Sequence, residues 1–339
     1  MPNFVLSRMP PLASERGMRA IHDLVAEQHF SSLEELHAAL EQARASSALQ
    51  AAVERPPTDP VALAFYLRCE VERLPSGLAN TREYNRLLRK ALAIDPECVE
   101  AGLMLLNQRQ VSRVARIARL RKLVAMAERR LGAGAFEGLR GHFWGELETR
   151  AYMRARATLA RALAWAGDAE GAAHMGALLE LCPGDNLGLR DDLMAWRLRR
   201  RESEAALALA SAYPDDTSLV MVWARAIAHA QLQDGPAALS QFRRVFVEYP
   251  ELRDAFEDPA LLRDMLGVIG HTPPDDVPVG GLEEVAYAFC QIGEPAAADP
   301  FVLDLTCRAL LLVCHPPPRN APCPCDSGAK FKKCCGRPV

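Results

Sequence analysis

Apolar residues recur every three or four positions along most of this chain, which is the spacing of one face of a helix. Two such runs follow one another near the N-terminus: Ile21, Leu24 and Val25, then Leu33, Leu36 and Leu40. Ser31 and Ser32 stand directly before the second run, where a serine side chain can cap a helix. The pattern predicts a helical hairpin within residues 1–55.

A proline-rich stretch, residues 55–60, ends this first segment, because proline removes a backbone donor and disfavours helical geometry in the preceding residue. Beyond it, amphipathic runs end repeatedly at a proline, namely at Pro96, Pro183, Pro214 and Pro250. The intervals are 87, 31 and 36 residues, so any repeat is irregular.

The run that ends at Pro250 places Ala238, Phe242 and Val245 after an Asp-Gly pair. This run resembles the second helix of a tetratricopeptide repeat, whose nominal period is about 34 residues. The resemblance implies that residues 60–270 form helical hairpins stacked into a superhelix, with a concave face that binds a peptide or protein.

Two further segments precede the C-terminus. Residues 272–281 are rich in proline and glycine and are predicted to be a linker, and an additional helical pair is predicted over 282–315. Three consecutive prolines, 316–318, then predict a stiff spacer that holds a small module, residues 319–339, away from the main body.

Composition agrees with an all-α fold, because half of the residues are hydrophobic whereas only 6% are aromatic. The formal charge of −3 singles out no class of partner. No apolar run reaches the roughly 18 residues of a membrane span, and the first residues lack a basic cluster followed by an apolar stretch. We therefore expect a soluble, cytoplasmic protein.

The ten cysteines fall into two groups. Six are scattered along helical patterns and are expected to be buried free thiols: Cys69, Cys98, Cys182, Cys290, Cys307 and Cys314. The other four crowd into thirteen residues as two close pairs separated by an eight-residue loop: Cys323, Cys325, Cys334 and Cys335.

Two close pairs of thiolates joined by a short loop can converge on one tetrahedral ion, and zinc prefers such a shell. Four protein ligands leave no open position for water, so the predicted Zn²⁺ site is structural. A disulfide-linked tail and an uncoordinated tail are the alternatives. His315 is a competing fourth ligand, but we favour Cys335.

The tail also resembles the SEC-C motif, named for the C-terminus of the translocation ATPase SecA, in its Cys-x-Cys and Cys-Cys pairs, its Ser327-Gly328 turn and its aromatic Phe331. Asp326 departs from the usual glycine. In SecA this tail binds the export chaperone SecB through a basic surface. The resemblance implies that the basic residues Lys330, Lys332 and Lys333 belong to a protein-docking face.

A second basic feature is the segment from Arg109 to Arg130, which interleaves arginines with apolar residues and is predicted to be a basic amphipathic helix. It suggests nucleic-acid contact through residues such as Arg113 and Arg116, although such runs are more often the solvated face of a packed helix. A nucleic-acid or ribosome-associated factor using this helix and the tail is therefore the alternative function.

Catalysis is not expected. His142, Glu146 and Glu148 could serve as ligands or acid/base groups, but no second cluster completes a site, and phosphate-loop and nucleophile motifs are absent. The sequence predicts a zinc-binding interaction or scaffold protein whose helical repeats bind a protein or peptide.

Overall fold

The computed structural model describes residues 12–337 except 27, 29, 75–80, 259, 262, 265, 267–279 and 326. Within these residues the regular elements are helices, and one isolated antiparallel bridge joins Pro322 to Lys330. The prediction of an all-α fold is confirmed. Most of the predicted linker, and Asp326 in the tail, lie outside the described residues.

The chain divides into two compact units that meet along the sequence at Leu187 and Gly188. The helices of the N-terminal unit are α1 (Leu12–Ala26), α2 (Leu33–Ala45), α3 (Ala48–Glu54), α4 (Pro60–Glu72), α5 (Thr81–Ile94), α6 (Val99–Asn107), α7 (Arg113–Leu131), α8 (Ala133–Gly138), the 3₁₀ turn η2 (Phe143–Gly145), α9 (Leu147–Trp165) and α10 (Glu170–Leu181).

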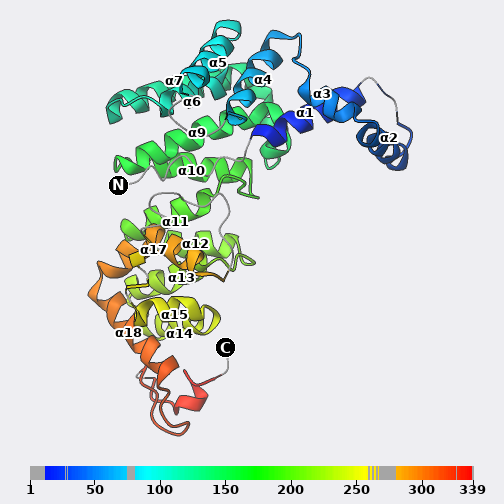
Figure 1. Ribbon diagram of the computed structural model, residues 1–339. Helices are drawn as coiled ribbons and strands as arrows, with labels where there is room; N and C mark the ends of the chain where they lie inside the picture. Colours follow the sequence, from blue (N-terminus) through cyan, green and yellow to red (C-terminus); the bar gives the residue numbers. More distant parts are fainter. Residues whose placement is uncertain are drawn as a thin grey trace. The chain divides into compact units, whose positions relative to one another are not determined.

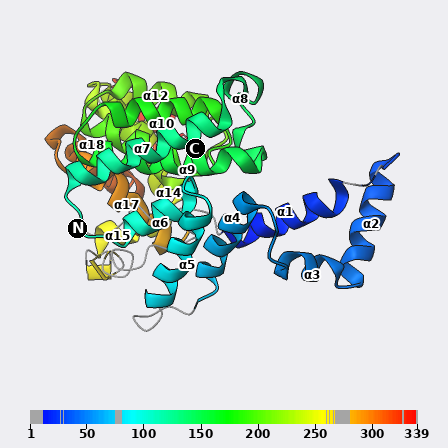
Figure 2. The same ribbon diagram turned by 90° about the horizontal axis from the view of Figure 1, so that it is seen from above.

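The centre of the N-terminal unit is α9, which packs against α6, α7 and α10 and buries most of its residues. At the other end of the unit, α1 packs against α3 and α4, and α2 packs against α3. Helices α2 and α3 bury no residue and extend away from α7 and α9 (Figures 1 and 2). The first three helices therefore form an arm with little core of its own.

The predicted cap of the second helix is confirmed. The Ser32 hydroxyl accepts a hydrogen bond from the Glu35 amide at 3.2 Å, and the Glu35 carboxylate accepts one from the Ser31 amide at 2.7 Å. The first bond satisfies one of the amide donors that every helix start leaves unpaired, and the second ties the residue before the cap to the first turn of the helix.

The C-terminal unit contains α11 (Leu189–Arg199), α12 (Ser203–Ala212), α13 (Leu219–Gln231), α14 (Gly235–Glu248), α15 (Pro250–Glu257), α17 (Leu282–Ala297), α18 (Pro300–Cys314) and the 3₁₀ turn η3 (Phe331–Lys333). Here α13 is the most buried helix, and it packs against α11, α12, α14, α17 and α18. Its Trp223 meets the ring of Phe289 edge-on, with 4.9 Å between the ring centroids.

Three hairpins share one turn geometry. Gly167, Arg201 and Gln233 follow α9, α11 and α13 with positive φ, and the amide of the next residue bonds a carbonyl five residues back in each case. This is the Schellman arrangement, which satisfies carbonyls at a helix end. The three turns are 34 and 32 residues apart, so the hairpins recur close to the spacing expected from the sequence.

The predicted helix-ending prolines all lie at helix boundaries. Pro96, Pro183 and Pro214 follow α5, α10 and α12, whereas Pro250 is the first residue of α15. At the crossing of α9 and α10, a Cβ on Gly171 would stand 2.6 Å from the carbonyl oxygen of Ala160. The close approach of these two helices therefore requires glycine at this position.

The expectation of six buried thiols is only half right. Cys69, Cys98 and Cys182 are buried, but Cys290 and Cys307 are exposed and Cys314 is half-buried. Cys290 lies on α17 and Cys307 on α18, whereas the Cys314 thiol at the end of α18 donates to the Glu257 carboxylate of α15 at 3.1 Å.

Candidate metal centre

The four cysteines of the tail lie together. Their Sγ atoms are all within 4.8 Å of one another, and Cys325 is 3.3 Å from both Cys323 and Cys334. Four sulfurs around one zinc ion, each at about 2.3 Å, are separated by about 3.8 Å. The cluster therefore has the size and the donor set of a four-coordinate thiolate site.

A short backbone reversal brings the two pairs together. The Cys323 amide donates to the Ala329 carbonyl at 2.8 Å, and the Phe331 amide donates to the Ala321 carbonyl at 2.8 Å. Gly328 reverses the chain between them with a φ of 70°, which glycine adopts without strain. Ser327 donates to the Cys334 sulfur at 3.2 Å and accepts from the Ala329 amide.

A small core lies beside the sulfurs. Phe331 is 6% exposed, and its carbonyl accepts hydrogen bonds from the amides of Cys334 and Gly336 at 3.0 and 2.7 Å. The turn η3 thus places the second cysteine pair directly after a buried aromatic anchor. Cys323 and Cys335 are buried, and Cys325 and Cys334 are partly exposed.

The thiols influence each other's ionisation. Although burial acts in the opposite direction, hydrogen bonds from Ser327, Cys323 and Cys334 lower the pKa of Cys325 to about 6. Burial, followed by hydrogen bonds with Cys323 and Cys325, raises the pKa of Cys335. A divalent cation would stabilise all four as thiolates, which is the form that binds metal.

The tail is not held away from the rest of its unit, contrary to the expectation from the three prolines. The Arg308 guanidinium on α18 donates to the Pro324 carbonyl, and the Arg243 guanidinium on α14 lies 6.0 Å from the centroid of the Phe331 ring. Figure 1 shows the tail beside the end of α18. Both arginines dock the module although the sequence pattern gave no sign of it.

The predicted binding lysines all lie on the surface, between the two cysteine pairs in the sequence. Lys330, Lys332 and Lys333 are exposed, as are Arg319 and Arg337. His315 ends α18 as an exposed C-cap residue and is not among the residues whose ligand atoms converge. The described residues therefore bring four cysteines together, with Cys335 as the fourth.

Comparison with known families decides what this tail resembles. Residues 319–337 match the model of the SEC-C motif. The SEC-C match covers the tail and does not extend to the helical units. No curated protein and no solved structure matched the chain.

The basic segment outside the SEC-C tail is used mainly for packing within its own unit. Helix α7 begins at Arg113, so Arg109 precedes it. Arg116 donates to the Asn107 side chain at 3.2 Å, and Arg121 pairs with Glu170 at 2.6 Å. Arg129 and Arg130 pair with acidic residues after α5, whereas Arg113 is exposed and makes no ion pair within the described residues.

The other candidate residues do not form a compact site. His142, Glu146 and Glu148 are exposed around η2 and the start of α9, and they do not join a group of ligand atoms in the described part of the chain. The sequence pattern also missed a buried cluster of arginines and glutamates nearby, because its members are far apart along the chain. No helix among the described residues is long and apolar enough to cross a bilayer.

Proposed function

We propose that this chain is a cytoplasmic, zinc-binding interaction protein. Its helical hairpins, of tetratricopeptide-like type, bind a protein or peptide, and the SEC-C tail is an accessory docking module. The observation that carries the proposal is the convergence of four cysteine sulfurs within 4.8 Å, inside the segment that matches the SEC-C model.

Zinc is the metal that we propose, because a closed tetrahedral shell of four thiolates is typical of its structural sites. Such a shell leaves no position for a reacting water, so we propose a structural and non-catalytic role. The exposed lysines around the cluster offset the negative charge that four thiolates leave on a divalent ion. They also form the basic surface that we propose for an acidic partner.

Nucleic-acid contact through α7 is the weaker candidate. Four of its arginines already contact groups within the N-terminal unit, which leaves fewer of them for phosphates. Arg113, Arg119 and Lys122 are exposed without an ion pair among the described residues, but exposed basic residues are common on the solvated face of a packed helix.

Elemental analysis of purified chains tests the metal. We expect about one zinc per chain, and its loss when Cys323→Ser and Cys325→Ser are combined, because two ligands cannot hold a structural ion. Cys307→Ser, an exposed cysteine on α18, is the matched control and keeps the zinc. Zinc content that survives the double substitution contradicts the assignment.

A second variant tests whether the tail binds a partner. The combined Lys330→Glu, Lys332→Glu and Lys333→Glu variant is expected to keep its zinc and to lose partners that the unsubstituted chain co-purifies through the tail. Partners retained by this variant are assigned to the helical units. If it retains every partner, the tail has no docking role.

A further inference from the structure

A buried cluster of charges lies inside the N-terminal unit, apart from the metal centre. It comprises Arg150 and Arg154 on α9, Glu100 on α6 and Glu15 on α1. The Arg154 side chain is 1% exposed and donates to the Glu100 carboxylate at 2.6 Å. Burying an ion is costly unless it is paired, so this arginine requires carboxylates around it.

Glu15 is held like a ligand. One of its carboxylate oxygens accepts hydrogen bonds from Arg154 Nη2 and, at 3.3 Å, from Arg150 Nη1, and the other accepts from Arg154 Nη1 at 3.2 Å. The Trp144 ring lies 4.9 Å from the Arg150 guanidinium and 5.3 Å from that of Arg154. Two arginines stacked on one aromatic ring thus present a fixed fork, the geometry that matches a carboxylate.

Other described side chains of α1 also make polar contacts. Arg16 pairs with Glu70, donates to the Val53 carbonyl at 2.6 Å and lies 4.0 Å from the centroid of the Tyr66 ring. Arg19 donates to Glu148 at 3.4 Å. Among the residues of α1 whose burial is described, the buried apolar side chain is that of Ala20. A segment with little buried apolar surface opens at a lower free-energy cost than the core does.

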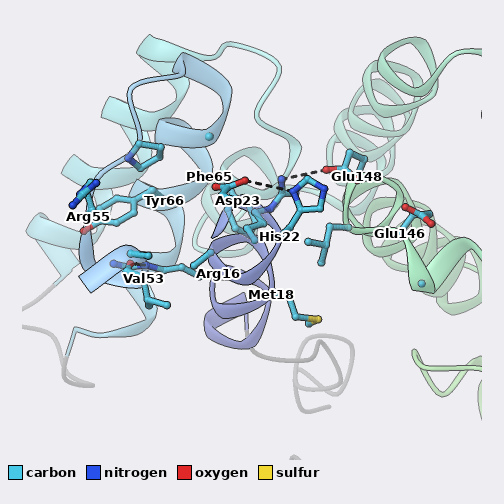
Figure 3. A pocket seen from close by; sticks show the side chains of 17 residues that line it. Arg16, Met18, His22, Asp23, Val53, Arg55, Phe65, Tyr66, Glu146 and Glu148 are labelled. Carbon is cyan, nitrogen blue, oxygen red and sulfur yellow. Dashed lines mark hydrogen bonds and ion pairs between the residues drawn. The ribbon is translucent and has the colours of Figure 1, made fainter. Parts of the chain in front are cut away.

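A cavity of about 440 Å³ runs beside α1 (Figure 3). Arg16, Met18, His22 and Asp23 line it from α1, and Phe65, Tyr66, Glu146 and Glu148 line it from α4 and the start of α9. The helix therefore leaves open space against its neighbours. Helices α2 and α3, the rest of the arm, add little buried surface to hold α1 in place, since they bury no residue.

We propose that Arg150, Arg154 and Trp144 form a binding site for the glutamate carboxylate of a helical peptide from a partner protein, and that Glu15 of α1 occupies this site in the free chain. The inference rests on the proposed function, because it names the kind of partner that the helical units take. The preferred peptide carries glutamate followed by arginine one and four residues later, which reproduces the contacts of Glu15, Arg16 and Arg19.

Displacement of α1 by such a peptide keeps the buried charges balanced. When Glu15 leaves, the two arginines keep one carboxylate, that of Glu100, and the incoming glutamate restores the second. A peptide without a carboxylate at the position of Glu15 leaves the arginines underpaired, so the site discriminates by the charge of that side chain as well as by shape.

A labelled peptide with the sequence of residues 12–26 tests the site on full-length chains by fluorescence anisotropy. The receptor is the combined Glu15→Gln, Arg16→Gln and Arg19→Gln variant, whose own α1 is weakened. We expect it to bind the peptide at least about tenfold more tightly than the unsubstituted chain, where the tethered α1 competes at high effective concentration. Arg19→Gln alone is a milder receptor for use if the triple variant loses helical signal in circular dichroism.

The matched control is the same peptide with glutamine in place of its glutamate. We expect its affinity for the receptor to fall by roughly tenfold or more, because hydrogen bonds to a charged group are lost. Equal binding of the two peptides, or no gain in affinity for either receptor variant, overturns the proposal.

A Cys323→Ser, Cys325→Ser version of the receptor separates this inference from the proposed function. Peptide binding that survives in this version supports the carboxylate site, whereas an unsubstituted chain that captures no partner contradicts the wider interaction role. Peptide binding that depends on the tail cysteines overturns the site, because the tail is not part of it.

Discussion

Gly336 shows how tightly the metal module is built at the level of single residues. A Cβ at this position would stand 2.7 Å from the Phe331 ring and 2.8 Å from the Phe331 carbonyl oxygen. Real side-chain carbons do not approach so closely, so the turn must shift. Because Cys335 directly precedes this glycine, the shift moves one of the four clustered cysteines.

We therefore expect Gly336→Ala to weaken zinc binding by about tenfold or more, as measured by competition with a chromophoric chelator. Gly134→Ala is the matched control, since that glycine has open space in α8 and an ordinary φ. Unchanged zinc affinity in Gly336→Ala would show that the turn can relax without displacing Cys335.

The residues that the sequence identified correctly act locally. The cysteine pairs and the Ser32 cap depend on spacings of fewer than a dozen residues, and each was predictable from those spacings. The exposure of Cys290 and Cys307 could not be predicted in this way. Helical periodicity shows which residues share a face of a helix but not whether another element covers that face. The docking arginines Arg243 and Arg308 belong to distant helices and leave no pattern near the tail.

At the scale of elements, the ion pair between α7 and α10 gives a pH dependence. The hydrogen bond from Arg121 lowers the pKa of Glu170 to about 2. A carboxylate whose pKa falls on folding stabilises the fold above its unfolded pKa, near 4.5, and this contribution is lost as the pH falls through about 2. The tie between the two helices is therefore present at neutral pH and absent in strong acid.

Arg121→Gln is expected to lower the free energy of unfolding at pH 7 by at most about 1 kcal/mol, because both side chains are exposed and the pair is screened. Urea unfolding followed by circular dichroism measures the difference, which should shrink as the pH is lowered from about 4.5 toward 2. Arg113→Gln, on the same helix but without an ion pair, should show little effect at any pH. A difference for Arg121→Gln that persists at pH 2 would show that packing, not charge, is responsible.

The hairpin turns explain why element boundaries were harder to predict than the helices themselves. Position 167 is a glycine, as expected for a left-handed turn, but Arg201 and Gln233 adopt the same geometry although they are not glycines. In the sequence, the repeat was visible instead from the prolines that follow the second helix of each hairpin, and these prolines are less regularly spaced than the turns. Local backbone geometry therefore repeats more regularly than the residues that mark it.

At the scale of the whole molecule, the contacts that the sequence did not predict join segments that are far apart along the chain. Glu15 and Arg154 are 139 residues apart, and each looks like an ordinary charge on an amphipathic helix. Only the fold shows that they meet in a buried site. The all-α architecture followed from periodicity and composition, whereas this internal pairing followed from tertiary packing.

Removal of zinc separates the stability of the tail from that of the helices. A segment of about 20 residues with one buried aromatic cannot bury enough surface to fold alone, so we expect its structure to depend on the proposed metal. The core of the C-terminal unit, around α13, contains none of the four cysteines. We expect a chelator to leave the helical circular dichroism signal and its thermal midpoint nearly unchanged, and to speed tryptic cleavage after Lys330, Lys332 and Lys333.

The Arg308→Gln variant, assayed with zinc bound, shows whether the metal or the docking contact on α18 protects the tail from trypsin. This substitution removes the hydrogen bond to the Pro324 carbonyl but leaves all four sulfurs, so cleavage at the three lysines should stay slow. If Arg308→Gln alone makes these sites as sensitive as chelation does, docking onto α18 rather than zinc orders the tail. If chelation also abolishes the helical signal, the metal supports the whole unit, and the module is not the independent attachment that its separate small core implies.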